Sequence, residues 1–326
     1  MIALLAAART VHFASTAMVT GAALFQYLVA APAFRTAAIG GSSSARAYRV
    51  RLATVLWIGF ALAVLSGAAW LLALAAKIGS SPPVAASGGV TWVLLTETQF
   101  GHQWMARAFL AGLLFCALWL GKPSNAGTRF EHGLMTVAAL CLMGSLAWSG
   151  HAAGSPGVIG DIHLIADVLH LVAAGAWLGG LMPLSLLFVL AIRQTDPSLA
   201  STLQVATRRF STLGLLSVGT LLATGLVNMW MLAGSLPALL ETDYGRLLLL
   251  KIALFVAMVA IASINRLRLT PGLPKTEAVH RLDRNTRVEL ALGLAIIAIV
   301  SVLGVLSPAD HMGMQMKSAL SSDARN

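Results

Sequence analysis

The chain has 326 residues, of which 58% are hydrophobic and 10% are charged, and its formal net charge is +10. Apolar runs of about 20 residues recur along the whole length, and each could cross a hydrocarbon core about 30 Å thick. This composition excludes a soluble domain, and the lack of alternating polar and apolar residues excludes a β-barrel. The basic residues lie in short loops between the apolar runs, so the charge does not indicate nucleic-acid binding. The sequence predicts an all-α, polytopic membrane protein.

Eight apolar segments predict eight membrane-spanning helices. The first segment is too long for the core of a signal peptide, so we expect the protein to retain it as a span. In chain order the predicted spans cover residues 3–32, 52–77, 104–121, 132–150, 160–192, 210–234, 245–269 and 287–307.

The loops after the odd-numbered spans carry most of the basic residues, whereas the intervening loops carry few cations. Lys and Arg accumulate in cytoplasmic loops, so the odd-numbered loops should be cytoplasmic. Both termini are therefore expected outside the cytoplasm. The most basic loop follows the seventh span and holds Arg266, Arg268, Lys275, Arg281, Arg284 and Arg287.

The two halves of the sequence align as an internal repeat. His12 and His170 lie 158 positions apart, and Ser66-Gly67 has the same offset from Thr224-Gly225. Each half has four spans, so both halves enter the membrane from the same side, which predicts a parallel repeat. We expect a first repeat at 1–152, a second at 153–308 and a tail at 309–326. Other pairs at this offset are Gly21 and Gly179, Arg51 and Arg209, Glu131 and Glu289, and Ser149 and Ser307.

A shorter offset of 144 relates the third span to the seventh. The motif that begins at Glu97 and leads to Arg107 matches the motif that begins at Glu241 and leads to Lys251. The Pro/Gly/Ser-rich stretch at 79–91 accounts for the 14-residue difference. We expect each basic side chain to snorkel toward the interface or to pair with the glutamate of its own motif.

The fifth span carries polar residues that share one helical face. His163, Asp167 and His170 fall within a narrow stripe when the helix advances 100° per residue. Polar groups inside an apolar span are costly and usually have a functional partner. The stripe is therefore a candidate metal-binding face. A buried imidazole such as His12 or His170 could instead hydrogen-bond a neighbouring helix, as Asn228 is expected to do.

A second group of candidate ligands lies on the predicted outer side. Imidazole accepts several transition metals, whereas thioether sulfur selects Cu(I), so a mixed His/Met set fits copper better than zinc. The methionines of the tail could instead form a flexible apolar segment on the bilayer. The complete set of candidate metal ligands is His12, His151, Asp161, His163, His170, Asp310, His311 and Met312.

Two other functions fit the same residues. His12 and His170 are expected at equal depth, about 15 Å from the outer side, and could ligate a haem b axially between the repeats. A copper sensor or scaffold could bind the ion outside without moving it. The sequence contains no Walker loop, dinucleotide-binding fingerprint, G-x-S-x-G elbow or CxxC motif, so we do not expect an enzyme.

Several segments resemble the CopD family of bacterial copper-handling inner-membrane proteins. The resemblance rests on H-L-V-A-A-G-A-W-L-G-G-L-M-P-L at 170–184, and on the segments 208–213, 221–228, 242–251, 265–267, 288–293 and 307–311. It implies inward copper transport across the inner membrane, often beside a periplasmic copper carrier called CopC. It names the metal, as Cu(I) or Cu(II), more firmly than the residue spacing does, and it places both termini in the periplasm.

The resulting hypothesis is a copper-binding membrane protein that takes the ion from the periplasm. His151, His163 and His311 would capture copper, and Asp161 and Asp310 would orient these ligands or add oxygen ligands. His170 and His12 would then pass the ion toward the membrane centre. The lipid bilayer and a CopC-like carrier are the expected partners.

Overall fold

The computed structural model describes residues 2–78, 89–121, 127–149, 157–193, 197–232 and 240–306, and these residues form helices without any strand. Eight of the helices within this part are long and apolar enough to cross a membrane, as the sequence predicts. The first half contains α1 (Ile2–Phe25), a π-helical turn (Gln26–Ala30), α2 (Ala31–Thr36), α3 (Ser43–Ile78), α5 (Gly89–Glu97), α6 (Gln99–Gly121), α7 (Arg129–Gly144) and a 3₁₀ turn (Ser145–Ser149).

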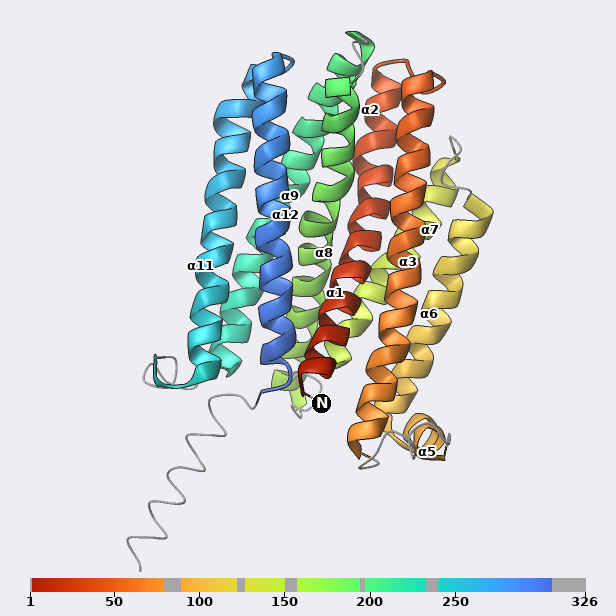
Figure 1. Cartoon of the computed structure of the whole chain (residues 1–326), viewed down its shortest axis with the longest axis vertical. Helices are drawn as coiled ribbons and strands as arrows, with labels where there is room; N and C mark the ends of the chain where they lie inside the picture. Colours follow the sequence, from red (N-terminus) through yellow and green to blue (C-terminus); the bar gives the residue numbers. More distant parts are fainter. Residues whose placement is uncertain are drawn as a thin grey trace, which may run out of the picture.

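The second half repeats the pattern of long helices. It contains α8 (Gly157–Arg193), α9 (Pro197–Leu232), α11 (Asp243–Ile264), a second π-helical turn (Asn265–Leu269), a 3₁₀ turn (Thr270–Gly272) and α12 (Thr276–Leu303). Figure 1 shows these helices running side by side, with α1 and α8 in the middle of the bundle.

Three helices begin about ten residues earlier than the sequence predicts. They are α3, α9 and α12, which start at Ser43, Pro197 and Thr276. Hydropathy locates only the part of a helix that lies in hydrocarbon, and a charged segment can continue the same helix into the headgroup region. In α12 this extension contains an exposed pair in which Arg281 Nη2 lies 2.6 Å from Glu277 Oε1, four residues away.

The centre of the bundle is a close crossing of α1 and α8. A Cβ atom added to Gly21 would overlap the backbone of Gly179, and one added to Gly179 would overlap the carbonyl of Ala17. Small residues at a helix crossing let two backbones approach, which is the packing expected from these glycines. Large buried side chains, including Phe25 and Phe188, surround the crossing.

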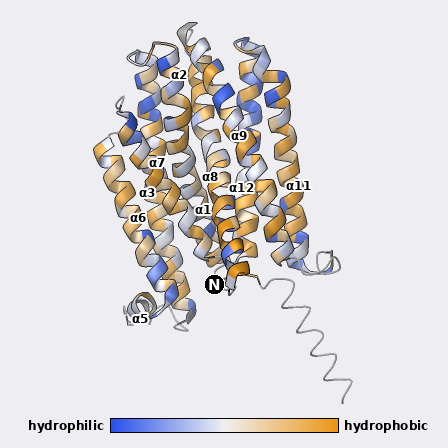
Figure 2. Ribbon diagram, turned by 180° about the vertical axis from the view of Figure 1, so that it is seen from behind, coloured by the Kyte–Doolittle hydropathy of each residue, from blue (hydrophilic) through white to orange (hydrophobic). Residues whose placement is uncertain are grey.

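The outer surface of the bundle is apolar along most of its length. Hydrophobic residues cover the sides of the helices, and hydrophilic residues gather toward the two ends (Figure 2). Large exposed hydrophobic side chains include Leu65, Trp119, Leu216 and Leu226. A surface of this kind fits contact with lipid and supports the predicted bilayer environment.

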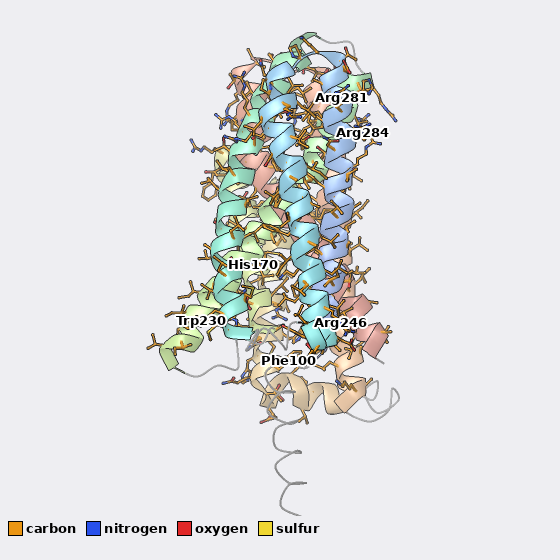
Figure 3. All side chains as sticks on the ribbon, turned by 90° about the vertical axis from the view of Figure 1, so that its left-hand side faces the viewer. Phe100, His170, Trp230, Arg246, Arg281 and Arg284 are labelled. Carbon is orange, nitrogen blue, oxygen red and sulfur yellow. The ribbon has the colours of Figure 1, made fainter. Side chains whose placement is uncertain are left out.

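The two ends of the bundle differ in their residues. Arg281 and Arg284 lie at one end, whereas His170, Trp230 and Arg246 lie nearer the other (Figure 3). The start of α1 and the end of α12 share this second end (Figure 1). The assignment of that end to the periplasm rests on the charge bias and stays a prediction.

Candidate functional site

The polar stripe of α8 is present as predicted, and His163 is the member of the stripe that has no hydrogen-bond partner within the described residues. The His163 side chain is 2% exposed, and neither ring nitrogen has a hydrogen-bond partner within the described residues. Asp161, half a turn earlier, is exposed. A buried imidazole without a hydrogen-bond partner is unfavourable, so the two ring nitrogens of His163 are available to bind a ligand.

His170 lies two turns further along α8 and is held by α9. Its Nδ1 atom is 2.9 Å from Oγ1 of Thr224, and this hydroxyl donates its own hydrogen to the carbonyl of Thr220 at 2.6 Å. The hydroxyl oxygen therefore accepts, and His170 Nδ1 carries the hydrogen. The lone pair is left on Nε2, which is the form of imidazole that binds metals.

Asp167 lies between the two histidines and contacts two other helices. Nδ2 of Asn228 donates to Asp167 Oδ1 at 2.6 Å, so this amide bonds between helices as expected. Lys251 of α11 interacts electrostatically with Asp167 and with His170. The sequence-based expectation was that Lys251 snorkels toward the interface or pairs with Glu241, which is close to it in the chain.

His12 has the same tautomer as His170. Its Nδ1 atom lies 2.9 Å from the carbonyl oxygen of Ala63 and 3.4 Å from Oγ of Ser66. A carbonyl can only accept, so Nδ1 carries the hydrogen, and Nε2 is buried without a partner. The ring lies 5.8 Å from the Trp70 ring and 6.1 Å from the Trp104 ring, measured between centroids.

The contacts of the two histidines support the predicted repeat. Ser66 and Thr224, which hold them, are themselves 158 positions apart. The next residues also correspond, because a Cβ atom on Gly67 would lie 3.1 Å from Cε1 of His12, and one on Gly225 would lie 3.8 Å from the same atom of His170.

The arrangement gives no support to a shared haem. His12 is bonded to α3, whereas His170 is bonded to α9. These two helices lie on opposite sides of the α1–α8 pair (Figure 1). Axial ligation of one haem would require both imidazoles to face a common space.

Several predicted ligands fall outside the described residues. They are His151, Asp310, His311 and Met312. Among the described residues no three His, Cys, Asp or Glu side chains lie close enough to hold a metal ion together. The described part of the chain therefore supplies single imidazoles and carboxylates, and a complete ligand set stays a prediction.

His132 is a buried histidine that the predicted ligand set does not include; it lies on α7 with 3% of its surface exposed. Its Nε2 atom lies 3.4 Å from Nε2 of Gln26. The helix starts earlier than expected because Thr128 and Glu131 form a capping box. The T-x-x-E pattern was the signal that could have placed this start.

Comparison with known proteins identifies the family. The model of the copper resistance protein D-like N-terminal domain matches residues 1–161, and that of copper resistance protein D matches residues 204–303. Copper resistance protein D of Pseudomonas syringae pv. tomato is 31% identical over 292 residues, covering 82% of this chain and 86% of the relative.

Two further relatives agree with this assignment. Inner membrane protein YebZ of Escherichia coli (strain K12) is 30% identical over 304 residues, covering 93% of this chain and 97% of the relative. Copper transport protein CutJ of Bacillus subtilis (strain 168) is 32% identical over 213 residues, covering 64% of this chain and 37% of the relative. The chain thus belongs to the copper resistance protein D family, as a multi-pass protein of the inner membrane.

Proposed function

We propose that the protein binds copper at the periplasmic side and moves it into the membrane along α8. The observation that carries this proposal is the buried His163 imidazole, whose two nitrogens have no partner within the described residues, on the same helical face as His170, whose Nδ1 atom is held by Thr224. Relatives named for copper resistance and copper transport support copper as the ion.

The spacing along α8 makes the two histidines successive sites. Seven residues separate His163 from His170, which corresponds to about 10.5 Å along a helix. One ion cannot be ligated by both imidazoles at that separation, because metal–nitrogen bonds are about 2 Å long. Copper would pass from His163 to His170, with Asp167 between them balancing its charge.

The outer end of the route would be completed by the predicted ligands around it. Asp161 is exposed near the start of α8 and can offer carboxylate oxygen. His151, Asp310, His311 and Met312 would add imidazole, oxygen and thioether ligands, a mixture suited to both oxidation states of copper. A CopC-like carrier would deliver the ion to this mouth.

His12 is the less favourable of the two equivalent histidines for a metal cation. Arg9 and Arg107 both act on it electrostatically, and their positive charges oppose a metal cation at this place. His170 instead has Asp167 on the same face, which partly balances the charge of Lys251.

The inner half of the route has room near the second π-helical turn. A cavity of about 130 Å³ is lined by Trp177, Thr207, Asn265 and Glu289 among other residues. Nδ2 of Asn265 donates to Oε1 of Glu289 at 2.6 Å. A carboxylate in such a cavity can stabilise a passing cation, and an interior-negative potential adds about 2.3 kcal/mol per charge per 100 mV.

Metal content and the visible spectrum of the purified protein test this function. We expect wild-type protein loaded with Cu(I) or Cu(II) to retain copper without a Soret band, and the His163→Ala/His170→Ala variant to lose it. His280→Ala is the matched control, because His280 is exposed on α12. If the double variant retained as much copper as wild-type protein, the copper site would not lie on α8. A Soret band with little bound copper would favour the haem alternative.

A further inference from the structure

Two buried arginines in the first half have no negative partner. Arg9 is 7% exposed and Arg107 is 3% exposed, and neither takes part in an ion pair within the described residues. Nε of Arg9, and Nε and Nη1 of Arg107, have no hydrogen-bond acceptor there. Unpaired charge in a membrane-embedded bundle is strongly unfavourable, so these groups require an anion.

Both guanidinium groups lie over the ring of Trp70, and that of Arg107 also lies over Trp104. The Arg9 guanidinium lies 4.8 Å from the ring centroid of Trp70, and that of Arg107 lies 5.2 Å from Trp104 and 6.0 Å from Trp70. The two indoles are 5.4 Å apart, and Trp104 Nε1 is also buried without an acceptor. Indole faces attract cations but accept none of the in-plane N–H bonds of a guanidinium.

Arg107 is partly satisfied from α7 and its following turn. Its Nη2 atom donates to the carbonyl of Ser145 at 2.9 Å and to the hydroxyl of Ser149. These neutral acceptors fix the direction of the side chain without neutralising its charge. The Nε and Nη1 atoms of the guanidinium have no acceptor within the described residues and are available to donate to a further group.

The internal repeat shows what is missing. Arg9 occupies the position that Asp167 occupies in the second half, and Arg107 occupies that of Lys251. In the second half the carboxylate of Asp167 acts on Lys251 and partly balances its charge. In the first half both positions are cationic. The first half therefore lacks a carboxylate at the position where the second half has Asp167.

We propose that Arg9, Arg107 and Trp104 form an oxyanion-binding site for a carboxylate or phosphate group. The guanidinium groups supply positive charge and single N–H donors that have no acceptor among the described residues, and the indole supplies a further donor. This site uses none of the α8 residues of the proposed copper route and does not depend on them.

The anion has two possible sources with the same chemistry. One is a small anion from solution. The other is the carboxylate of Asp310, since the backbone of Gly304 packs against the Arg9 guanidinium. Asp310 lies six positions after Gly304, which corresponds to a reach of roughly 20 Å for an extended chain. Asp310 lies outside the described residues.

Thermal unfolding of the delipidated, full-length protein in a neutral detergent at low ionic strength tests the site. If the anion comes from solution, acetate or inorganic phosphate raises the unfolding temperature of wild-type protein by several degrees and the effect saturates. If Asp310 supplies it, wild-type protein does not respond, while Asp310→Asn unfolds at a lower temperature and is restored by acetate.

The arginine variants decide whether the response belongs to this site. Whichever protein responds to acetate or phosphate, wild type or Asp310→Asn, adding Arg107→Gln to it should abolish the response. Arg208→Gln, which changes an exposed arginine on α9, should leave the response intact. Arg9→Asp recreates the carboxylate and cation of the second half, so it should fold and show no response to acetate even when combined with Asp310→Asn.

Two results would overturn the proposal. One is the lack of a saturable response in both wild-type protein and Asp310→Asn. The other is a response that persists in Arg107→Gln or, if that variant does not fold, in Arg9→Asp combined with Asp310→Asn.

Discussion

His170 Nδ1 lies 2.9 Å from Thr224 Oγ1, and the hydroxyl of Thr224 is already committed as a donor to the carbonyl of Thr220. This contact fixes the imidazole as an Nδ1–H tautomer and leaves a lone pair on Nε2. In the first half, Ser66 stands in the same relation to His12, again 54 positions away. The two halves therefore present the same form of histidine, and what differs is the charge around it.

The Thr224 hydroxyl should control metal affinity at His170. Thr224→Val removes the oxygen that accepts from Nδ1, so the ring loses its fixed orientation and tautomer. We expect Cu(I) affinity to fall roughly 10- to 100-fold, as for other groups that hold a metal-binding histidine. Competition with a chromophoric Cu(I) chelator measures the change. Thr224→Ser keeps the oxygen and should bind nearly as wild type; equal losses in both variants would argue against this role.

Asp167 should stabilise the protein through Lys251. Asp167→Asn leaves the ammonium without its carboxylate, which should lower stability by roughly 1–3 kcal/mol. Thermal unfolding in detergent measures the loss, and Lys251→Met in the same background should recover part of it. Asp243→Asn is the matched control, because that carboxylate is exposed and lies 4.0 Å from Arg246. A loss that Lys251→Met does not reduce would contradict the coupling.

The α1–α8 crossing should not accept even one methyl group. Gly179→Ala places a Cβ atom against the carbonyl of Ala17, so we expect a destabilisation of roughly 1–3 kcal/mol. Gly219→Ala on α9 is the control, because nothing lies within 4 Å of its added Cβ atom. Unfolding temperatures that are equal for the two variants would show that the crossing can relax.

The cavity beside Glu289 should affect passage of copper more than its binding. Glu289→Gln keeps the size of the side chain and removes its charge, so copper retained by the purified protein should be unchanged while uptake slows. Copper content and uptake measured on the same preparation separate the two effects. Glu277→Gln, on the exposed face of α12, should change neither. Loss of bound copper in Glu289→Gln would place this residue in the binding site instead.

The sequence predicts the number of spans and the polar stripe of α8 well, because apolar length and helical periodicity are local properties. Helix starts such as Ser43 and Thr276 are missed, since hydropathy marks the hydrocarbon boundary and not the end of the helix. Gly21 and Gly179 are the local signal of the α1–α8 crossing, because small residues in a span let two helices approach closely.

The partners of buried charges could not be predicted in the same way. Arg107 was expected to snorkel or to pair with Glu97, yet it bonds to Ser145 and Ser149 across the helix pair. Lys251 likewise acts on Asp167 of another helix. Such contacts depend on the rotation of packed helices, which one sequence does not determine.

Copper uptake into proteoliposomes tests the central claim most directly. The wild-type protein should admit copper, faster when the interior is negative, and His163→Ala/His170→Ala should lose this uptake while His280→Ala keeps it. Orientation can be selected by protease access to the basic segment just before α12, which contains Lys275. Uptake that is unchanged in the double variant would contradict a route along α8. Copper binding without any uptake by the wild-type protein would favour a sensor or scaffold.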